Sequence, residues 1–326
     1  MNEQIILLLT SFAISFVLSL IIIPLLKKLK VGQIERTDGP QSHLKKQGTP
    51  TMGGVIMILN IIIMAIITMI QNQGGDWAGE QNLLVLAFIT VGFGIVGLVD
   101  DLKKLLGKNT KGLEPKLKMF GLLLIAVIYV VFLTNVLKIG TDIYIPFFEN
   151  TLTLPIWLYI PFAVFVLLAT TNAVNLTDGV DGLATTVTTI IFTCLTVIGI
   201  MTETKEVALM GSILVGTCLS FLLFNLHPAK VMMGDTGSLL LGGAMAGIAL
   251  YLKMPLLLLI IALIPVIETL SVMIQVAYYK KTGKRVFKMA PIHHHFELCG
   301  WRENKVVAVF GAVTLVLCII GLMSIS

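Results

Sequence analysis

The residues best suited to chemistry are acids, amides, histidines and lysines gathered in five short segments between long apolar runs. The segments are SHLKKQGTPTMGG at 42–54, DDLKK at 100–104, NAVNLTDGVDG at 172–182, HPAKVMMGDTGS at 227–238 and APIHHHFE at 290–297. Carboxylate and amide oxygens suit Mg²⁺, and imidazoles and ammonium groups suit phosphate. This mixture is typical of phosphoryl transfer, in which a divalent metal and cations neutralise charge on the transferring phosphate.

The acids in these segments have two interpretations. Asp100 and Asp101 are adjacent at the carboxyl end of an expected helix, where the partial charge is negative, so they need a cation, a metal or a raised pKa. They could be a metal ligand and a base, or Lys103 and Lys104 could simply neutralise them. Asp235 precedes an apolar run, so it could bind a metal or only cap a helix.

The segment 172–182 carries four polar residues three positions apart: Asn172, Asn175, Asp178 and Asp181. On a helix this spacing would bring them to one side. The segment contains two acids and no lysine or arginine. A binding loop is the functional interpretation, and turn and cap residues are the alternative.

Three consecutive histidines, His293, His294 and His295, lie among basic residues. They cannot all point at one centre from a regular helix, so we do not expect a structural metal site. Imidazoles with a pKa near 6.5 suit phosphate binding, and a basic patch at the membrane surface is the alternative.

Two glycine patterns bear on nucleotide binding. No G-x-x-x-x-G-K-[ST] segment is present, which excludes a P-loop ATPase. The segment GFGIVG at 92–97 matches G-x-G-x-x-G by letter, but it lies inside an apolar run, where close packing between helices explains it better.

The elements that must position these segments are membrane helices. Of 326 residues, 56% are hydrophobic and 13% are charged, against roughly a quarter charged in soluble domains. This composition excludes a soluble enzyme, a disordered chain and a nucleic-acid module.

We expect an all-α fold, a single transmembrane domain over 1–326, with kinks at Pro161 and Pro265 and a small hairpin in 138–154. Ten spans of suitable length are expected: 4–26, 52–71, 82–99, 119–136, 155–172, 183–201, 207–225, 237–252, 255–278 and 306–323.

The basic residues orient these spans. Of 23 lysines and arginines, only Lys138, Lys205 and Lys253 lie in loops on one side. The positive-inside rule therefore places the other loops, with all five chemical segments, in the cytoplasm. Both termini are then extracytoplasmic.

Five motifs in order (TPTMGG, DD, NAVNLTDGVDG, MGDTGS and PIHHHFE) make the whole chain resemble the phospho-N-acetylmuramoyl-pentapeptide-transferase family. This family belongs to the polyprenyl-phosphate N-acetylhexosamine-1-phosphate transferases. The resemblance implies a Mg²⁺-dependent enzyme of the bacterial cell membrane with ten helices, usually a homodimer, whose active site faces the cytoplasm. UDP-MurNAc-pentapeptide and undecaprenyl phosphate would react to give lipid I and UMP in peptidoglycan synthesis.

The resemblance also implies residue roles. Asp100, Asp101 and Asp235 match the catalytic aspartates, with Asp100 as the expected base and Asp235 and Asn175 as metal ligands. Matches to substrate-binding positions are Lys46, Lys116, Asn172, Asn175, Asp178, Asp181, His293, His294 and His295. At Met232 many members carry a phenylalanine that stacks on uracil, and methionine can also pack against a ring.

Two other functions fit parts of the sequence. A sister transferase would act on another UDP-N-acetylhexosamine. A secondary transporter would place ionisable groups near the middle of the membrane and show repeats. Here the acids cluster at the ends of spans, except Glu268, and no repeat is evident.

Overall fold

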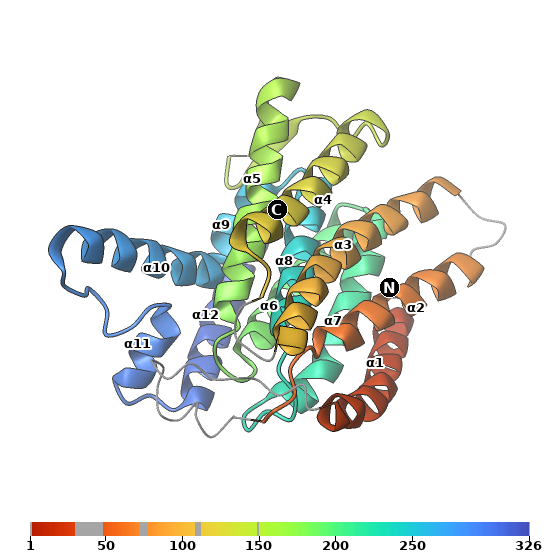
Figure 1. Ribbon diagram of the computed structural model, residues 1–326. Coiled ribbons are helices and arrows are strands. Elements are labelled where there is room, and N and C mark those ends of the chain that lie inside the picture. Colours follow the sequence, from red (N-terminus) through yellow and green to blue (C-terminus); the bar gives the residue numbers. More distant parts are fainter. Residues whose placement is uncertain (1, 30–47, 72–76, 108–111, 149, 326) are drawn as a thin grey trace.

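The protein is a bundle of helices with one short hairpin, as a computed structural model shows (Figure 1). The structure describes residues 2–29, 48–71, 77–107, 112–148 and 150–325. Its longer elements are α1 (Asn2–Lys28), α2 (Gly54–Gln71), α3 (Trp77–Gly107), α4 (Pro115–Asn135), β1 (Asp142–Ile145), β2 (Asn150–Thr153), α5 (Ile156–Thr177), α6 (Leu183–Met201), α7 (Lys205–Asn225), α8 (Gly234–Tyr251), α10 (Leu263–Thr282) and α12 (Glu303–Met323). The all-α prediction is confirmed, and so is the hairpin, in which Asp142 pairs with Thr153 and Ile145 with Asn150.

Every expected span coincides with a helix or a pair of helices. Seven of the described helices are long and apolar enough to cross a membrane, and the bent pair ending in α10 would make an eighth. Helix α2 is apolar but shorter. The structure therefore supports a multi-pass membrane protein with seven candidate spans.

Helix α8 forms the centre of the bundle (Figure 1). All residues from Thr236 to Leu250 are buried, as expected for a helix that is apolar on every side. It packs against α3, α5 and α2. The first turn of α8, which contains Asp235, is therefore held by three neighbouring helices.

Glycines let the ends of α2, α3 and α8 approach one point. A side chain at Gly54 would collide with the backbone of Gly237, and one at Gly97 would collide with the backbone of Asp235. Close helix packing is thus confirmed as the reason for glycine at position 97. The same contact places the end of α3 beside the start of α8.

The expected span 255–278 is broken. A short turn, η2 (Pro255–Leu257), leads into α9 (Leu258–Ile261), and α10 begins at Leu263 after a bend of 83°. Pro265 lacks an N–H group and its ring displaces the carbonyl of Ile261, four residues earlier. The predicted kink is confirmed and is a full break, beyond which α10 leaves the bundle (Figure 1). Pro161, in contrast, lies inside the continuous helix α5.

Candidate active site

Three aspartates meet where α3 ends and α8 begins. Asp100 and Asp101 lie in the last two turns of α3, and Asp235 lies in the first turn of α8. One carboxylate oxygen from each lies within 4.8 Å of the others. Like charges at this distance repel, so the cluster requires cations to hold it together.

Two lysines supply those cations. The Lys104 ammonium lies 2.6 Å from a carboxylate oxygen of Asp100, 2.8 Å from Asp235 and 3.5 Å from Asp101. The Lys118 ammonium, from α4, donates to the same Asp235 oxygen at 2.7 Å. Neutralisation by Lys104 is thus confirmed, whereas Lys103 is exposed.

Asp101 is fixed by the amino terminus of α8. One of its oxygens accepts hydrogen bonds from the backbone N–H of Thr236 at 2.9 Å and from the Thr236 hydroxyl at 2.7 Å. The Asp235 N–H donates to the other oxygen at 3.3 Å. A carboxylate is stabilised at a helix amino terminus by these unpaired N–H groups and by the helix dipole. Asp101 therefore joins α3 to α8 and orients Asp235.

The alternative prediction, that Asp235 only caps a helix, is wrong. The residue before α8 is Met233, and the Asp235 carboxylate contacts Lys104, Lys118 and Asn175 instead. Burial alone would raise the pKa of Asp235, but hydrogen bonding with Asp100 and the two ammonium groups outweigh burial and hold this pKa well below its usual range. Asp235 is therefore ionised at neutral pH.

Asp100 is held from its other side. The backbone N–H of Leu113 donates to one Asp100 oxygen at 2.7 Å, and a side chain at Gly112 would collide with this carboxylate. Asp100 thus has a fixed position next to Asp235, with a lysine on one side and the chain leading into α4 on the other.

Lys116, which the sequence analysis expects near the phosphates, does not contact the aspartates in this structure. Lys116 is exposed, and Lys118, two positions later, reaches the aspartates. The sequence analysis missed Lys118 because the face that α4 turns toward α3 depends on tertiary packing. Lys46 lies outside the described residues.

Of the two side-chain amides expected in the site, only that of Asn175 contacts the aspartate centre. The Asn175 amide N–H₂ donates to Asp235 at 2.9 Å and to the Ser238 hydroxyl at 2.8 Å. Asn172 donates instead to the Leu168 carbonyl of its own helix. Asn175 would bind a metal through its oxygen, with the amide turned over.

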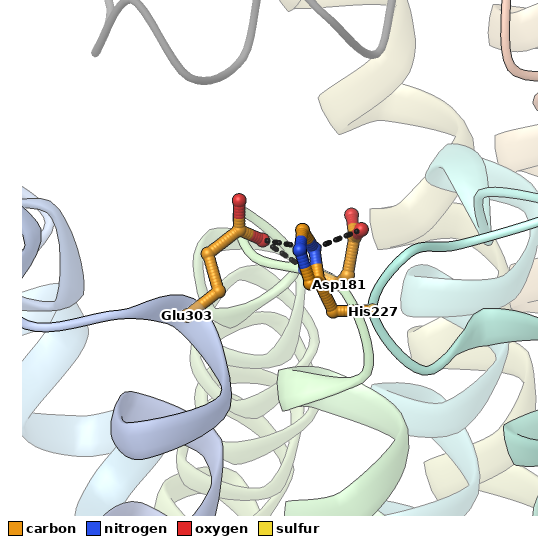
Figure 2. A group of neighbouring side chains, drawn as sticks. All are labelled: Asp181, His227 and Glu303. Atoms are coloured by element: carbon orange, nitrogen blue, oxygen red, sulfur yellow. Dashed lines mark hydrogen bonds and ion pairs between the residues drawn. The ribbon is translucent and has the colours of Figure 1, made fainter.

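The two acids of this segment leave the helix. Helix α5 ends at Thr177, so Asp178 is its half-buried C-cap and Asp181 lies in the following turn. The buried Asp181 accepts hydrogen bonds from the backbone N–H of Ala229 at 3.0 Å, and its carboxylate lies 3.1 Å from His227 Nδ1. Figure 2 shows His227 between Asp181 and Glu303 of α12, whose oxygen lies 3.6 Å from the same nitrogen.

The three histidines point to different partners, as the sequence predicts. They lie in α11 (Ile292–Leu298). His293 is fully buried against Glu268, with Nδ1 and Oε1 3.1 Å apart. His294 Nδ1 lies 2.8 Å from Glu297, and His295 Nδ1 accepts from the Lys288 N–H at 3.1 Å. His293 therefore has no exposed surface with which to contact a substrate directly.

The TPTMGG segment and Met232 contact each other. The Met232 N–H donates to the Pro50 carbonyl at 2.7 Å, and the Gly53 N–H donates to the Met232 carbonyl at 2.9 Å. Met232 remains half-buried beside the start of α8. This pairing connects the first chemical segment to the aspartate centre.

Two groups among the described residues have metal-ligand geometry: Asp100, Asp101 and Asp235, and Asp181, His227 and Glu303. The first group offers only oxygen atoms, which Mg²⁺ prefers, and two lysines already show that it attracts cations. A divalent ion would replace ammonium groups there. The donor set of the aspartate centre therefore fits Mg²⁺.

Comparisons with known proteins give matches over nearly the whole chain. The family model of glycosyl transferase family 4 matches residues 83–253, and signature 1 of phospho-N-acetylmuramoyl-pentapeptide-transferase matches residues 46–58. The phospho-N-acetylmuramoyl-pentapeptide-transferase of Acetivibrio thermocellus is 48% identical over 95% of this chain and 92% of its own. That of Clostridium botulinum strain Alaska E43 is 51% identical over 97% of this chain and 95% of its own.

Proposed function

The chain belongs to the phospho-N-acetylmuramoyl-pentapeptide-transferase family, and we propose from this that it transfers phospho-MurNAc-pentapeptide from UDP-MurNAc-pentapeptide to undecaprenyl phosphate. The products are lipid I and UMP, as peptidoglycan synthesis requires. The observation that carries the proposal is the centre of three aspartates and two lysines at the junction of α3, α4 and α8. A diphosphate donor and a phosphate acceptor both need such a concentration of cation sites.

The net reaction forms one bond and breaks one. An oxygen of the lipid phosphate bonds to the sugar-linked phosphorus of the donor, and the bond from that phosphorus to the bridging oxygen breaks, releasing UMP. Asp235 and Asn175, with Asp101 beside them, would hold Mg²⁺, which neutralises charge on the phosphates. Lys104 and Lys118 would pair with phosphate oxygens once they leave the carboxylates. Asp100 is the base for any proton left on the lipid phosphate.

The surrounding residues would bind the rest of the donor. Asn175 lies beside Asp235, and Met232 lies at the start of α8, so both border the centre. Asp178 and His294 are half-buried on neighbouring turns, where they can meet the nucleotide and the peptide. The basic loops favour a site on the cytoplasmic side and extracytoplasmic termini. The family resemblance supports ten spans and a homodimer in the bacterial cell membrane.

UMP release tests the proposal directly. Purified protein with Mg²⁺ and undecaprenyl phosphate is given UDP-MurNAc-pentapeptide or UDP-N-acetylglucosamine in parallel. We expect UMP only from the first donor, and only when the lipid phosphate is present. Faster release from UDP-N-acetylglucosamine would identify a sister transferase, and no UMP from either donor would contradict a transferase.

A further inference from the structure

Glu268 is an acidic residue inside an apolar helix, and it is not part of the aspartate centre. It lies in α10, and its side chain is fully buried. A buried carboxylate in a membrane protein is costly unless it is paired, and such residues usually serve a function. Its role must be found in what it contacts.

Glu268 holds α11 at two points. Its Oε1 lies 3.1 Å from Nδ1 of His293, and its Oε2 accepts the backbone N–H of His293 at 3.4 Å. The His293 side chain is fully buried as well. The carboxylate therefore fixes both the backbone and the ring of one residue in the histidine segment.

The opposite edge of the His293 ring contacts the turn between α5 and α6. A side chain at Gly179 would collide with Nε2 of His293, so the ring occupies the space that a side chain at 179 would fill. Gly179 follows Asp178 directly. Within the described residues, both ring nitrogens of His293 are buried and have no hydrogen-bond partner, so packing against Glu268 and Gly179 holds the ring in place.

His293 also adjoins His294. The ring centroids of His293 and His294 are 4.1 Å apart, and His294 is partly exposed. One buried ring thus lies between Glu268 on one side and two proposed substrate contacts, Asp178 and His294, on the other.

We propose that Glu268 is a positioning residue: through His293 it sets the turn that carries Asp178, and the orientation of His294, for binding of the nucleotide-linked donor. This inference rests on the proposed function. The Glu268 carboxylate accepts the backbone N–H of His293 through Oε2, and its Oε1 lies against Nδ1 of the ring, so Glu268 sets where the ring lies. Glu268 touches no substrate atom.

A double-mutant cycle tests the proposal. Glu268→Gln, His293→Asn and the double variant are compared for KM of UDP-MurNAc-pentapeptide, KM of undecaprenyl phosphate, and kcat. We expect Glu268→Gln to lower kcat/KM for the donor about 10- to 100-fold, by analogy with loss of the outer partner of a metal-ligating histidine. The KM of the lipid should stay within about twofold, and the double variant should lose no more than His293→Asn alone.

Two further variants separate positioning from damage to the fold. Ser271→Ala removes another buried polar group of α10, a hydroxyl that donates to the backbone carbonyl of Glu268 at 2.7 Å, and it should leave donor kinetics unchanged. Gly179→Ala displaces the ring from its other side, and should raise the donor KM even if Glu268→Gln does not fold.

The outcomes distinguish this inference from the proposed function. If the parent releases UMP but Glu268→Gln and Gly179→Ala keep its donor KM, Glu268 is not a positioning residue. Additive losses in the cycle, or an equal rise in the lipid KM, would also overturn the inference. A parent that releases no UMP would overturn the proposed function, and the inference with it.

Discussion

Replacing Lys104 by methionine removes the cation that touches all three aspartates. The Lys104 ammonium lies between 2.6 and 3.5 Å from Asp100, Asp235 and Asp101. A hydrogen bond to a charged group contributes roughly 1.5–3 kcal/mol. Because the Lys104 side chain is 34% exposed, solvent screens the pair and we take the lower end, about 1.5 kcal/mol. We therefore expect Lys104→Met to lower the free energy of unfolding by this amount in EDTA.

The same change should strengthen metal binding. With all three carboxyl groups ionised, as metal binding requires, the two ammonium groups leave the centre a formal net charge of −1, and the variant would have −2. Two unit charges about 4 Å apart interact by ~4 kcal/mol at an effective dielectric of 20, and a divalent ion doubles this, so we expect at least about a tenfold lower Mg²⁺ concentration for half-maximal stabilisation.

Thermal unfolding across a Mg²⁺ titration, in one detergent, measures both effects. Lys103→Met is the matched control, since Lys103 is the exposed neighbour on the same helix. The reasoning fails if Lys103→Met destabilises the protein as much, or if Lys104→Met responds to Mg²⁺ as the parent does.

Four further predictions concern single sites. Asp235→Asn should abolish Mg²⁺-dependent UMP release while the protein stays folded by gel filtration; full activity at excess Mg²⁺ would contradict this. Asp101→Asn should lower the free energy of unfolding by about 1–2 kcal/mol, because a carboxylate is lost from the amino terminus of α8; equal melting temperatures would refute it. Asp100→Asn should reduce turnover about 10²–10⁴-fold, the range for a lost general base, with partial recovery in alkali visible in a pH–rate profile. Cysteines at Lys284 and Thr151 should label from opposite sides of intact cells, and labelling of both from outside would reverse the proposed orientation.

The sequence predicted the aspartates of the centre and one of its two cations, Lys104, but not Lys118. Asp100 and Asp101 are visible as a pair, and Asp235 stands out before an apolar run. The contact of Lys104 with Asp100 follows from helical spacing, because residues four apart lie on one face. The contact of Lys118 with Asp235 depends on how α4 turns against α3, and no local pattern encodes this rotation.

Two other features also depend on distant parts of the chain. Asp181, His227 and Glu303 come from three separate segments, so no local pattern predicts that they meet. The three-residue spacing in 172–182 suggested one helix face, but the helix ends at Thr177, before Asp181. The break before α10 was visible only as Pro265. A proline predicts a kink, but the bend of 83° depends on what packs around it.

The lysines explain how three carboxylates can converge before any substrate arrives. Without cations the aspartates would repel one another. This repulsion would oppose the close contact between α3 and α8 that Gly97 permits. With Lys104 and Lys118 in place and all three carboxyl groups ionised, the centre has a formal net charge of −1, and binding of a divalent cation would change this to +1. The site would then change from attracting a cation to attracting a diphosphate. Metal binding before the donor, with the lysines released toward the phosphates, is the order of events that this charge balance favours.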